Sequence, residues 1–473
     1  MKPRKNSIPE NVKKIHIVAI CGTGMGALAC MLKDQGFEIT GSDDKVYPPM
    51  SEFLYSKGIN INKGFNSENL SYRPDLVIIG NAVGKDNPEA AAAMNLELNY
   101  CSMPQALNKF IAHGKKAILA TGTHGKTTTS SIIAWILYKA GLDPSFMIGG
   151  ILKNFSSNYR LGNGNYIVIE GDEYDTAFFD KGAKFLHYEP ALAVLTSVEF
   201  DHADIFHDLD HVKSVFNTFI SGLSNNSTIF GYDEDENITE LFINKKCKTQ
   251  RYGLRKDSGW LISDINISPP WNKFSVKKHG KIFGTFKTKM MGAHNLLNIL
   301  SAIAVCDSLS LPLEILQKAL ETFENVKRRQ EVRGVKNNIT IMDDFAHHPT
   351  AVRETINAVK PFYPEGRLIS VFEPRTNSSM RNVFQDIYPL SFDRADLICI
   401  RQPSLLEKIP QEIRFSSEKL VADLKKKDKD AHYFQDTDSI IDFLVSEAKP
   451  GDLVLVMSNG GFDNIHERLL GLL

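Results

Sequence analysis

Short apolar segments alternate with amphipathic helical segments along most of this chain, an alternation typical of α/β domains. The segments expected to form strands are Ile15–Ile20, Glu38–Gly41, Asp75–Gly80, Lys116–Thr121, Tyr166–Glu170, Leu192–Thr196, Thr340–Asp343, Leu368–Phe372, Leu397–Ile400 and Leu453–Met457. The segments with helical periodicity are Met25–Gln35, Pro88–Met94, Lys126–Ala140 and Asn295–Ser308. Residues 250–290 alternate apolar and polar side chains instead, which predicts a patch of antiparallel strands.

The chain has 473 residues, more than one hydrophobic core normally serves, so several domains are expected. We place three blocks at 1–110, 111–325 and 326–473. The first and third blocks are expected to be Rossmann-like α/β domains. The middle block is expected to be a phosphate-loop domain with a mostly parallel sheet.

The composition argues against several classes of protein. A net charge of −1 gives no reason to expect nucleic acid or an anionic membrane as a partner. The six cysteines are scattered without a C-x-x-C pair, which suggests neither a disulfide framework nor a zinc site and fits a cytoplasmic location. Residues 15–32 are apolar enough to imitate a signal peptide, but Gly22, Gly24 and Gly26 interrupt them, so a strand, loop and helix fit better than an export signal. No other segment approaches the roughly 20 apolar residues that a membrane span needs.

The most specific motif is a glycine-containing loop between an expected strand and an expected helix. Its residues are Thr121, Gly122, Thr123, His124, Gly125, Lys126, Thr127 and Thr128. In such a loop the backbone N–H groups and the helix N-terminus face a phosphate, the lysine reaches the β- and γ-phosphates, and the hydroxyl after it binds Mg²⁺. Ala120 stands where the usual motif has its first glycine, and the alternative is a structural glycine turn.

Acidic residues follow two of the expected strands. Glu170 ends one strand and is followed by Asp172, Glu173 and Asp175. A second acidic segment after Leu192–Thr196 contains Glu199, Asp201, His202 and Asp204. Hard oxygen ligands of this kind suit Mg²⁺, and the carboxyl ends of parallel strands face the ligand crevice. A solvated acidic loop is the alternative interpretation.

The N-terminal loop has the spacing of a dinucleotide fingerprint. Gly22, Thr23, Gly24, Met25, Gly26 and Ala27 follow the first strand, and Asp43 comes about twenty residues after the loop. The pattern predicts a pyrophosphate at a helix N-terminus, but it leaves open whether the ligand is NAD or a nucleotide-sugar. A tight structural turn is the alternative.

The third block carries a polar loop after its first expected strand. Asp344 is followed by the neighbouring residues His347 and His348, which rarely converge on one metal ion, so a loop that faces the active cleft is favoured. Arg375 follows the next strand, and its planar guanidinium suits a substrate carboxylate. A surface arginine is the alternative.

Taken together and in this order, these motifs resemble the Mur ligase family of peptidoglycan synthesis. The matching segments are the loop 121–128, the Glu170 cluster, Asp201-His202, the segment 292–298 and the segment 344–349. The resemblance implies an ATP-dependent ligase that joins a carboxylate to an amine through an acyl-phosphate. The first block would then bind a UDP-sugar, the middle block ATP, and the third block the amino-acid or peptide substrate.

The resemblance also implies roles for single residues. The catalytic residues would be Lys126, Glu170 and His202, and the ligands of two Mg²⁺ ions would be Thr127, Glu170, His202 and Glu173. ATP would be bound by the loop 121–128 and by His294, Asn295, Asn298, Arg329 and Asp344. The UDP-sugar would be bound by Gly22, Thr23, Gly24, Met25, Gly26, Asp43 and Asn81, and the peptide by His347, His348 and Arg375.

Two branches of the family compete for the substrate. Both act on UDP-N-acetylmuramate, one adding L-alanine and the other the recycled murein tripeptide L-alanyl-γ-D-glutamyl-meso-diaminopimelate. The segments Gly41–Met50, Glu173–Lys181, Glu199–Phe206, Phe372–Ser378 and Met457–Phe462 resemble the second branch more closely. Members that add later residues carry a carbamylated lysine where this chain has Phe216, so no carbamate is expected. An ATPase switch and an NAD-linked oxidoreductase are distant alternatives.

Overall fold

The structure, a computed structural model, describes residues 6–46 and 50–473, so residues 47–49 of the segment Gly41–Met50 lie outside the described part. The chain forms two compact units, each described here by itself. The first contains Met1–Val198, Asp210–Trp260 and Ser301–Ala319. The second contains Glu199–Leu209, Leu261–Leu300 and Leu320–Leu473.

The first unit begins with a parallel sheet of the Rossmann type. Its strands run in the order β3-β2-β1-β4-β5, with bounds Asn60–Lys63, Glu38–Asp43, Lys14–Val18, Leu76–Ile79 and Tyr100–Ser102. The helices are α1 (Thr23–Asp34), α2 (Met50–Ser56), α3 (Pro88–Asn95) and α4 (Met103–Leu107). From β1 the chain adds β2 and β3 on one side and then crosses to add β4 and β5 on the other. Ligands of such sheets bind at the carboxyl ends of the strands where the strand order changes direction, here β1 and β4.

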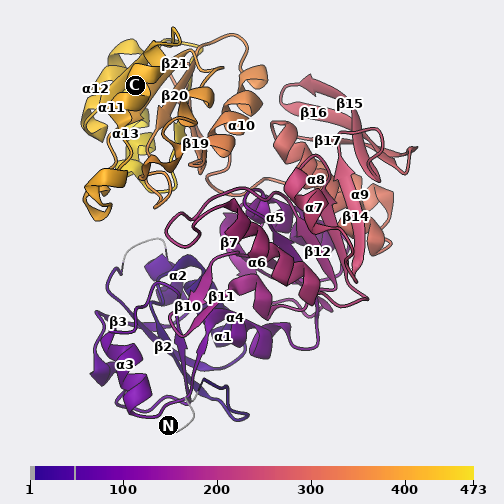
Figure 1. The fold of residues 1–473 in the computed structure, drawn as a ribbon, viewed down its shortest axis with the longest axis vertical. Coiled ribbons are helices and arrows are strands. Elements are labelled where there is room, and N and C mark those ends of the chain that lie inside the picture. Colours follow the sequence, from indigo (N-terminus) through magenta and orange to yellow (C-terminus); the bar gives the residue numbers. More distant parts are fainter. Residues whose placement is uncertain (1–5, 47–49) are drawn as a thin grey trace. The chain divides into compact units, whose positions relative to one another are not determined.

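A second sheet contains β6 (Lys116–Thr121), the strand that leads into the phosphate loop, and the helix after the loop is α5 (Lys126–Lys139) (Figure 1). The strands of this sheet that lie in the first unit are, in order, β14 (Lys248–Gly253), β13 (Thr228–Tyr232), β12 (Leu192–Leu195), β6, β9 (Tyr166–Gly171), β7 (Ser145–Leu152) and β8 (Ser157–Arg160). All the pairings from β14 to β7 are parallel, and β8 is antiparallel to β7. Helix α5 is buried along nearly its whole length, which anchors the loop that precedes it. The unit also contains the hairpin of β10 (Asp175–Ala177) and β11 (Asp180–Ala183), most of α6 (Leu209–Gly222), and α7 (Glu236–Leu241).

The second unit is built on a sheet in the order β18-β19-β23-β20-β21-β22. The strand bounds are Glu331–Lys336, Ile339–Asp344, Leu453–Met457, Leu368–Phe372, Leu397–Arg401 and Ala431–Phe434. Side chains of α10 (Pro349–Val359) and α11 (Ser417–Lys425) pack in one apolar core, and those of α12 (Thr437–Glu447) and α13 (Ile465–Leu472) pack in another. The strands and helices of this part are orange to yellow in Figure 1.

Part of the second unit lies before this sheet in the sequence. Strand β15 (Trp260–Ser268) precedes the antiparallel hairpin of β16 (Trp271–Lys278) and β17 (Lys281–Thr288). Helix α8 (Ala293–Ser308) runs from the second unit into the first, and α9 (Leu313–Thr322) follows it.

The predicted fold class is confirmed, and every strand expected from an apolar segment is present within a few residues. The antiparallel patch predicted for residues 250–290 was too long at its start, because β14 pairs in parallel with β13. The edge strands β8 and β18 were not predicted, since both consist mostly of polar residues and β18 is also largely exposed. The inner strands β7 and β13 were not predicted either. The block boundaries at 110 and 325 stay a prediction. Among the described residues, no helix has both the length and the apolar character needed to cross a membrane.

The first sheet is tied together by one fully buried carboxylate, that of Glu89 in the first turn of α3. Its oxygens accept hydrogen bonds from His16 Nε2 at 3.2 Å, from Asn69 Nδ2 at 2.5 Å and from the Ser42 hydroxyl. Burial alone would raise the pKa of Glu89, but these hydrogen bonds outweigh it and hold the pKa below its ordinary value. The carboxylate therefore joins β1, β2 and the chain before α3.

Replacing Glu89 by alanine should lower the free energy of unfolding by about 3 kcal/mol, because the donors on His16, Ser42 and Asn69 would lose a buried acceptor. A carboxylate with a lowered folded-state pKa stabilises the protein above its unfolded pKa and loses that contribution as the pH falls through the folded pKa. The wild type should therefore lose its advantage over the variant in acid. Chemical denaturation at several pH values measures both effects.

The matched control is Glu52→Ala, which removes an exposed glutamate from the first turn of α2. Its unfolding free energy should change by less than about 0.5 kcal/mol. Equal losses in the two variants would show that the buried network does not stabilise the sheet.

Candidate active site

The phosphate loop is held in shape by the end of β12 and the residues after it. Thr123 N donates to Ser197 O and His124 N donates to Ser197 Oγ, each at 2.9 Å. The Thr196 hydroxyl donates to Thr121 O at 3.0 Å and also to His124 O. The backbone of the loop is thus fixed by its neighbour in the sheet before any ligand is considered.

Two glycines give this loop its path. Gly125 precedes α5 with φ 80°, and Gly122 has φ 126°, a conformation that L side chains rarely adopt. A Cβ atom at Gly122 would overlap Thr196 Oγ1 and lie 2.8 Å from Ser197 N. Ala120, where the usual motif has its first glycine, is fully buried within β6.

Lys126, the first residue of α5, lies among carbonyl and carboxylate oxygens. Its Nζ donates to Gly122 O at 2.6 Å and to Glu173 Oε2 at 2.9 Å. Burial works to lower the pKa of Lys126, but Glu173 and Asp172 outweigh it and raise the pKa above its ordinary value. The lysine therefore carries a positive charge at the mouth of the loop at any physiological pH.

Glu170, at the end of β9, contacts the next residue of the helix. Thr127 Oγ1 donates to Glu170 Oε1 at 2.8 Å, and Gly149 N donates to Glu170 Oε2 at 2.7 Å. Burial, reinforced by Asp172, raises the pKa of Glu170. A hydroxyl and a carboxylate side by side beside a phosphate loop form a set of hard oxygen donors that fits Mg²⁺.

The N-terminal loop begins α1 as the fingerprint predicted. Gly22 is its N-cap, and Gly26 N donates to Gly22 O at 2.8 Å. Asp43, at the end of β2, accepts from Cys21 N at 2.9 Å and from Lys45 N at 3.0 Å, so its carboxylate also shapes the loop. Asn81 is exposed just after β4.

Cys21 is the most accessible of the cysteines in the part of the chain that the structure describes, since the other five are buried. Burial, helped by the negative charge of Asp43, raises the pKa of Cys21 to about 11. The thiol beside the N-terminal loop is therefore uncharged at neutral pH.

In the second unit, several of the residues predicted to bind ATP are joined through Gln330. Asn295 Nδ2 donates to Gln330 Oε1 at 3.2 Å, and Gln330 N donates to Asp344 Oδ2 at 2.8 Å. Asn298 Nδ2 lies 3.4 Å from Asn295 Oδ1, so these residues form one network. The guanidinium of Arg329 lies over the ring of Phe345 at 4.9 Å. Gln330 and Phe345 were not predicted, because no sequence motif marks either residue.

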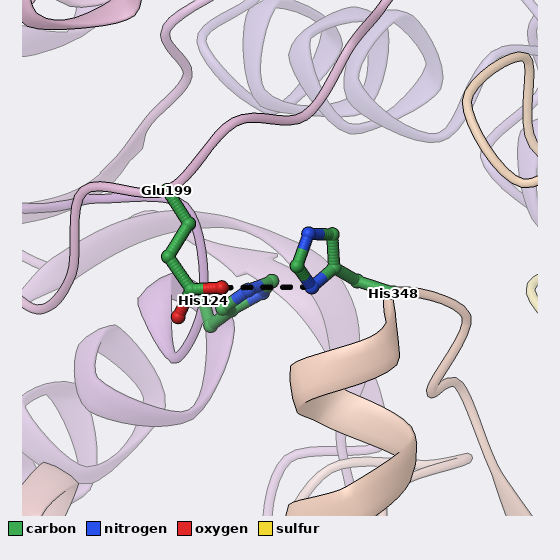
Figure 2. Close-up of side chains that lie close together, drawn as sticks. All are labelled: His124, Glu199 and His348. Carbon is green, nitrogen blue, oxygen red and sulfur yellow. Dashed lines mark ion pairs between the residues drawn. The ribbon is translucent and has the colours of Figure 1, made fainter. Parts of the chain in front are cut away.

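The adjacent histidines His347 and His348 differ in their hydrogen bonds. Thr350 N donates to His348 Nδ1 at 3.2 Å, so the other ring nitrogen carries the proton and donates to Phe200 O at 3.1 Å. His348 caps α10, and the carboxylate of Glu199 lies 3.7 Å from its Nδ1 (Figure 2). Both ring nitrogens of His348 are therefore used within the second unit.

His347 pairs instead with the acidic segment. Its Nε2 lies 3.8 Å from Asp201 Oδ2, and its Nδ1 lies 3.1 Å from Phe345 O. Burial works to raise the pKa of Asp201, but His347 outweighs it and holds the pKa well below its ordinary value. The adjacent His202 has φ 51°, a left-handed conformation that is uncommon for a residue other than glycine and is found often at functional sites.

Arg375 lies near a buried carboxylate that the sequence motifs did not indicate. Glu373 is fully buried and accepts from Arg401 Nη1 at 2.6 Å and from Ser458 Oγ at 2.7 Å. Arg375 Nη1 is 3.5 Å from the same carboxylate, a weaker contact. Glu373 is thus neutralised by Arg401, and Arg375 is the more exposed of the two arginines.

The predicted site residues thus form three groups. Lys126, Thr127, Glu170 and Glu173 lie together in the first unit, and the N-terminal loop with Asp43 lies at the carboxyl edge of the first sheet. The residues of the second unit are gathered around Asp344, His347 and the acidic segment. Their roles as ligands of substrates or metal stay predictions.

Comparison with known families defines the class of protein. Family profiles match three consecutive parts of the chain: "Mur ligase family, catalytic domain" at residues 14–115, "Mur ligase middle domain" at 120–306 and "Mur ligase, glutamate ligase domain" at 328–460. The chain belongs to the Mur ligase family and is an ATP-dependent amide ligase.

Individual relatives are similar over nearly the whole chain. The identity is 38% over 460 residues to the UDP-N-acetylmuramate–L-alanyl-γ-D-glutamyl-meso-2,6-diaminoheptandioate ligase of Haemophilus influenzae, covering 97% of this chain and 99% of that one. It is 33% over 465 residues to the UDP-N-acetylmuramate–L-alanine ligase of Acetivibrio thermocellus, covering 98% and 96%. The crystal structure of a murein peptide ligase from Psychrobacter arcticus has a TM-score of 0.73 and 32% identity, and the match covers 98% of each chain.

Replacing Gly122 by alanine should weaken ATP binding by at least about tenfold, because the new Cβ would push the loop away from Thr196 and Ser197. Isothermal titration with ATP and Mg²⁺ measures this effect. Gly141→Ala is a matched control, since Gly141 also has a positive φ, 73°, but nothing lies within 4 Å of its Cβ position. ATP binding should be unchanged in the control, and equal weakening in both variants would contradict the role of the close contact.

Proposed function

We propose that this enzyme joins the lactyl carboxylate of UDP-N-acetylmuramate to the alanine amine of L-alanyl-γ-D-glutamyl-meso-diaminopimelate. The observation that supports this substrate is the 38% identity to a ligase of that name, which extends over 99% of the relative's length. Ligation of L-alanine to the same acceptor is the second candidate, because the identity to such a ligase is 33% at similar coverage. The reaction belongs to peptidoglycan recycling and uses small soluble substrates, which fits a cytoplasmic location.

The first half of the proposed reaction forms an acyl-phosphate. A carboxylate oxygen of UDP-N-acetylmuramate attacks the γ-phosphorus of ATP, and ADP leaves with the electron pair of the broken P–O bond. Two anions must approach each other, so positive charge is required where they meet. Lys126 supplies that charge, and its contacts with Gly122 O and Glu173 hold it at the loop. The loop N–H groups and the start of α5 bind the phosphates.

The oxygen donors beside the loop suit the Mg²⁺ that accompanies the nucleotide. We assign Thr127, Glu170, His202 and Glu173 as the ligands of Mg²⁺, as the family resemblance implies, and Thr127 already donates to Glu170. When bound, Mg²⁺ neutralises phosphate charge and orients the transferred group. In the protein, Gly149 N keeps one oxygen of Glu170 fixed while the other faces Thr127.

The second half of the reaction forms the amide. The alanine amine attacks the acyl carbon, the tetrahedral intermediate collapses, and inorganic phosphate leaves with the electrons of the C–O bond. We assign ATP contacts to Arg329, Asp344 and the segment His294–Asn298, and peptide contacts to His347 and Arg375. His348 is also assigned to the peptide, and its hydrogen bonds with Thr350 N and Phe200 O fix its ring at the start of α10. Gly22–Gly26, Asp43 and Asn81 are assigned to the UDP-sugar.

Replacing Lys126 by alanine should lower kcat by at least about a thousandfold, because the charge that stabilises the transferring phosphoryl group is removed. Binding of UDP-N-acetylmuramate should be retained. ADP release and titration with the UDP-sugar measure the two properties separately. Lys139→Ala is the control on the same helix, where the lysine lies over the ring of Trp135, and it should keep normal turnover. Normal ADP release by Lys126→Ala would reject the assignment.

The substrate is tested by phosphate release from the wild-type enzyme with ATP, Mg²⁺ and UDP-N-acetylmuramate. The tripeptide should give a kcat/KM at least about tenfold above that with L-alanine, in line with the closer relative. A preference for L-alanine would overturn the tripeptide assignment and favour the second candidate. Mass spectrometry of the product identifies which amine was joined.

A further inference from the structure

The second unit contains a cavity of about 210 Å³ between the acidic segment and the chain before α11. Its lining residues are Phe200, Ala203, Phe206, His207, Arg381, Asn382, Val383 and Ile413. Pockets that enclose a whole small-molecule ligand are generally above about 300 Å³, so this cavity is suited to part of a substrate.

The cavity is a neighbour of the residues assigned to the peptide. On the acidic segment, Ala203 N donates to Ser378 Oγ at 3.0 Å, and Asp201 pairs with His347. Ser378 follows Arg375 in the same loop, and Arg381 N in turn donates to Ser378 O at 3.1 Å. One short stretch of chain therefore connects Arg375 to the wall of the cavity.

Arg381, which lines the cavity, has a side-chain donor that makes no hydrogen bond. Its Nε is buried and has no hydrogen-bond partner, although a buried unpaired donor costs free energy. Its backbone is held by a bridge to Arg414. The lining includes His207 but no carboxylate, and the nearby Asp204 is exposed and accepts from Asn377 Nδ2 at 2.8 Å. The cavity thus combines apolar side chains with a guanidinium whose Nε has no partner, a combination suited to a side chain that ends in a carboxylate.

We propose that this cavity receives the part of the peptide beyond its first alanine and that Arg381 binds a carboxylate there. The proposal rests on the proposed function and adds the residue that selects the peptide over L-alanine. The tripeptide has free carboxylates on its γ-D-glutamyl and diaminopimelyl residues, whereas L-alanine has none beyond its own. An arginine that binds one of them improves the binding of the peptide without affecting L-alanine.

The experiment compares Arg381→Met with the wild type in phosphate release at saturating ATP and UDP-N-acetylmuramate. In the variant the KM for the tripeptide should rise about 10- to 100-fold, the loss expected for a hydrogen bond to a charged group, with kcat nearly unchanged. The weak use of L-alanine should be the same in both proteins. Arg414→Met removes a half-buried arginine whose backbone forms the bridge to Arg381 but which does not line the cavity, and it should keep the wild-type KM.

Modified peptides test the same contact in the wild-type enzyme, even if Arg381→Met does not fold. Tripeptides amidated at the glutamyl or at the diaminopimelyl carboxylates are compared, and one of them should show the raised KM. That analogue should lose nothing further in Arg381→Met. A normal KM for all amidated peptides, or an equal loss with L-alanine and tripeptide, would overturn the role of Arg381. Absence of tripeptide-dependent phosphate release from the wild type would instead reject the proposed function itself.

Discussion

The charge of Lys126 is the constraint around which the first unit is organised. A buried ammonium group is costly unless oxygens surround it, and here carbonyl and carboxylate oxygens do so within 3 Å. Gly122 must adopt its left-handed path to present one of those carbonyls, and β9 must end at Glu170 to bring the acidic residues to the same edge. The parallel sheet and the buried helix α5 together place Lys126, Gly122 and Glu173 so that these oxygens surround the ammonium group.

In the second unit, contacts from several parts of the chain hold the acidic segment in one conformation. The segment Glu199–Leu209 contains no helix or strand before its last residue, so contacts with other parts of the chain fix it. The ring of His348, the Ser378 hydroxyl and the side chain of Asn377 each bind it at a different point. Asp201 and His202 are positioned by these contacts rather than by local secondary structure.

Sequence patterns predicted many of the strands, the phosphate loop and the Glu170 cluster because each depends on residues close together in the chain. The edge strands β8 and β18 were missed because they lack the apolar runs of central strands, and the inner strands β7 and β13 were missed although they are largely buried. Gln330, Glu373 and Arg381 were also missed. Their importance comes from partners such as Asn295, Ser458 and a cavity wall, which no local spacing reveals. Contacts between residues far apart in the chain are therefore the part of the site that the sequence did not predict.

The uncharged thiol of Cys21 has a consequence for chemistry at the N-terminal loop. A thiolate is the form of cysteine that reacts with alkylating agents and oxidants, and the raised pKa keeps that form scarce at neutral pH. Because the thiol stays protonated, Cys21 places no negative charge beside the loop Gly22–Gly26, which is suited to a diphosphate. Despite its partial exposure, Cys21 should therefore react slowly with electrophiles and oxidants at neutral pH.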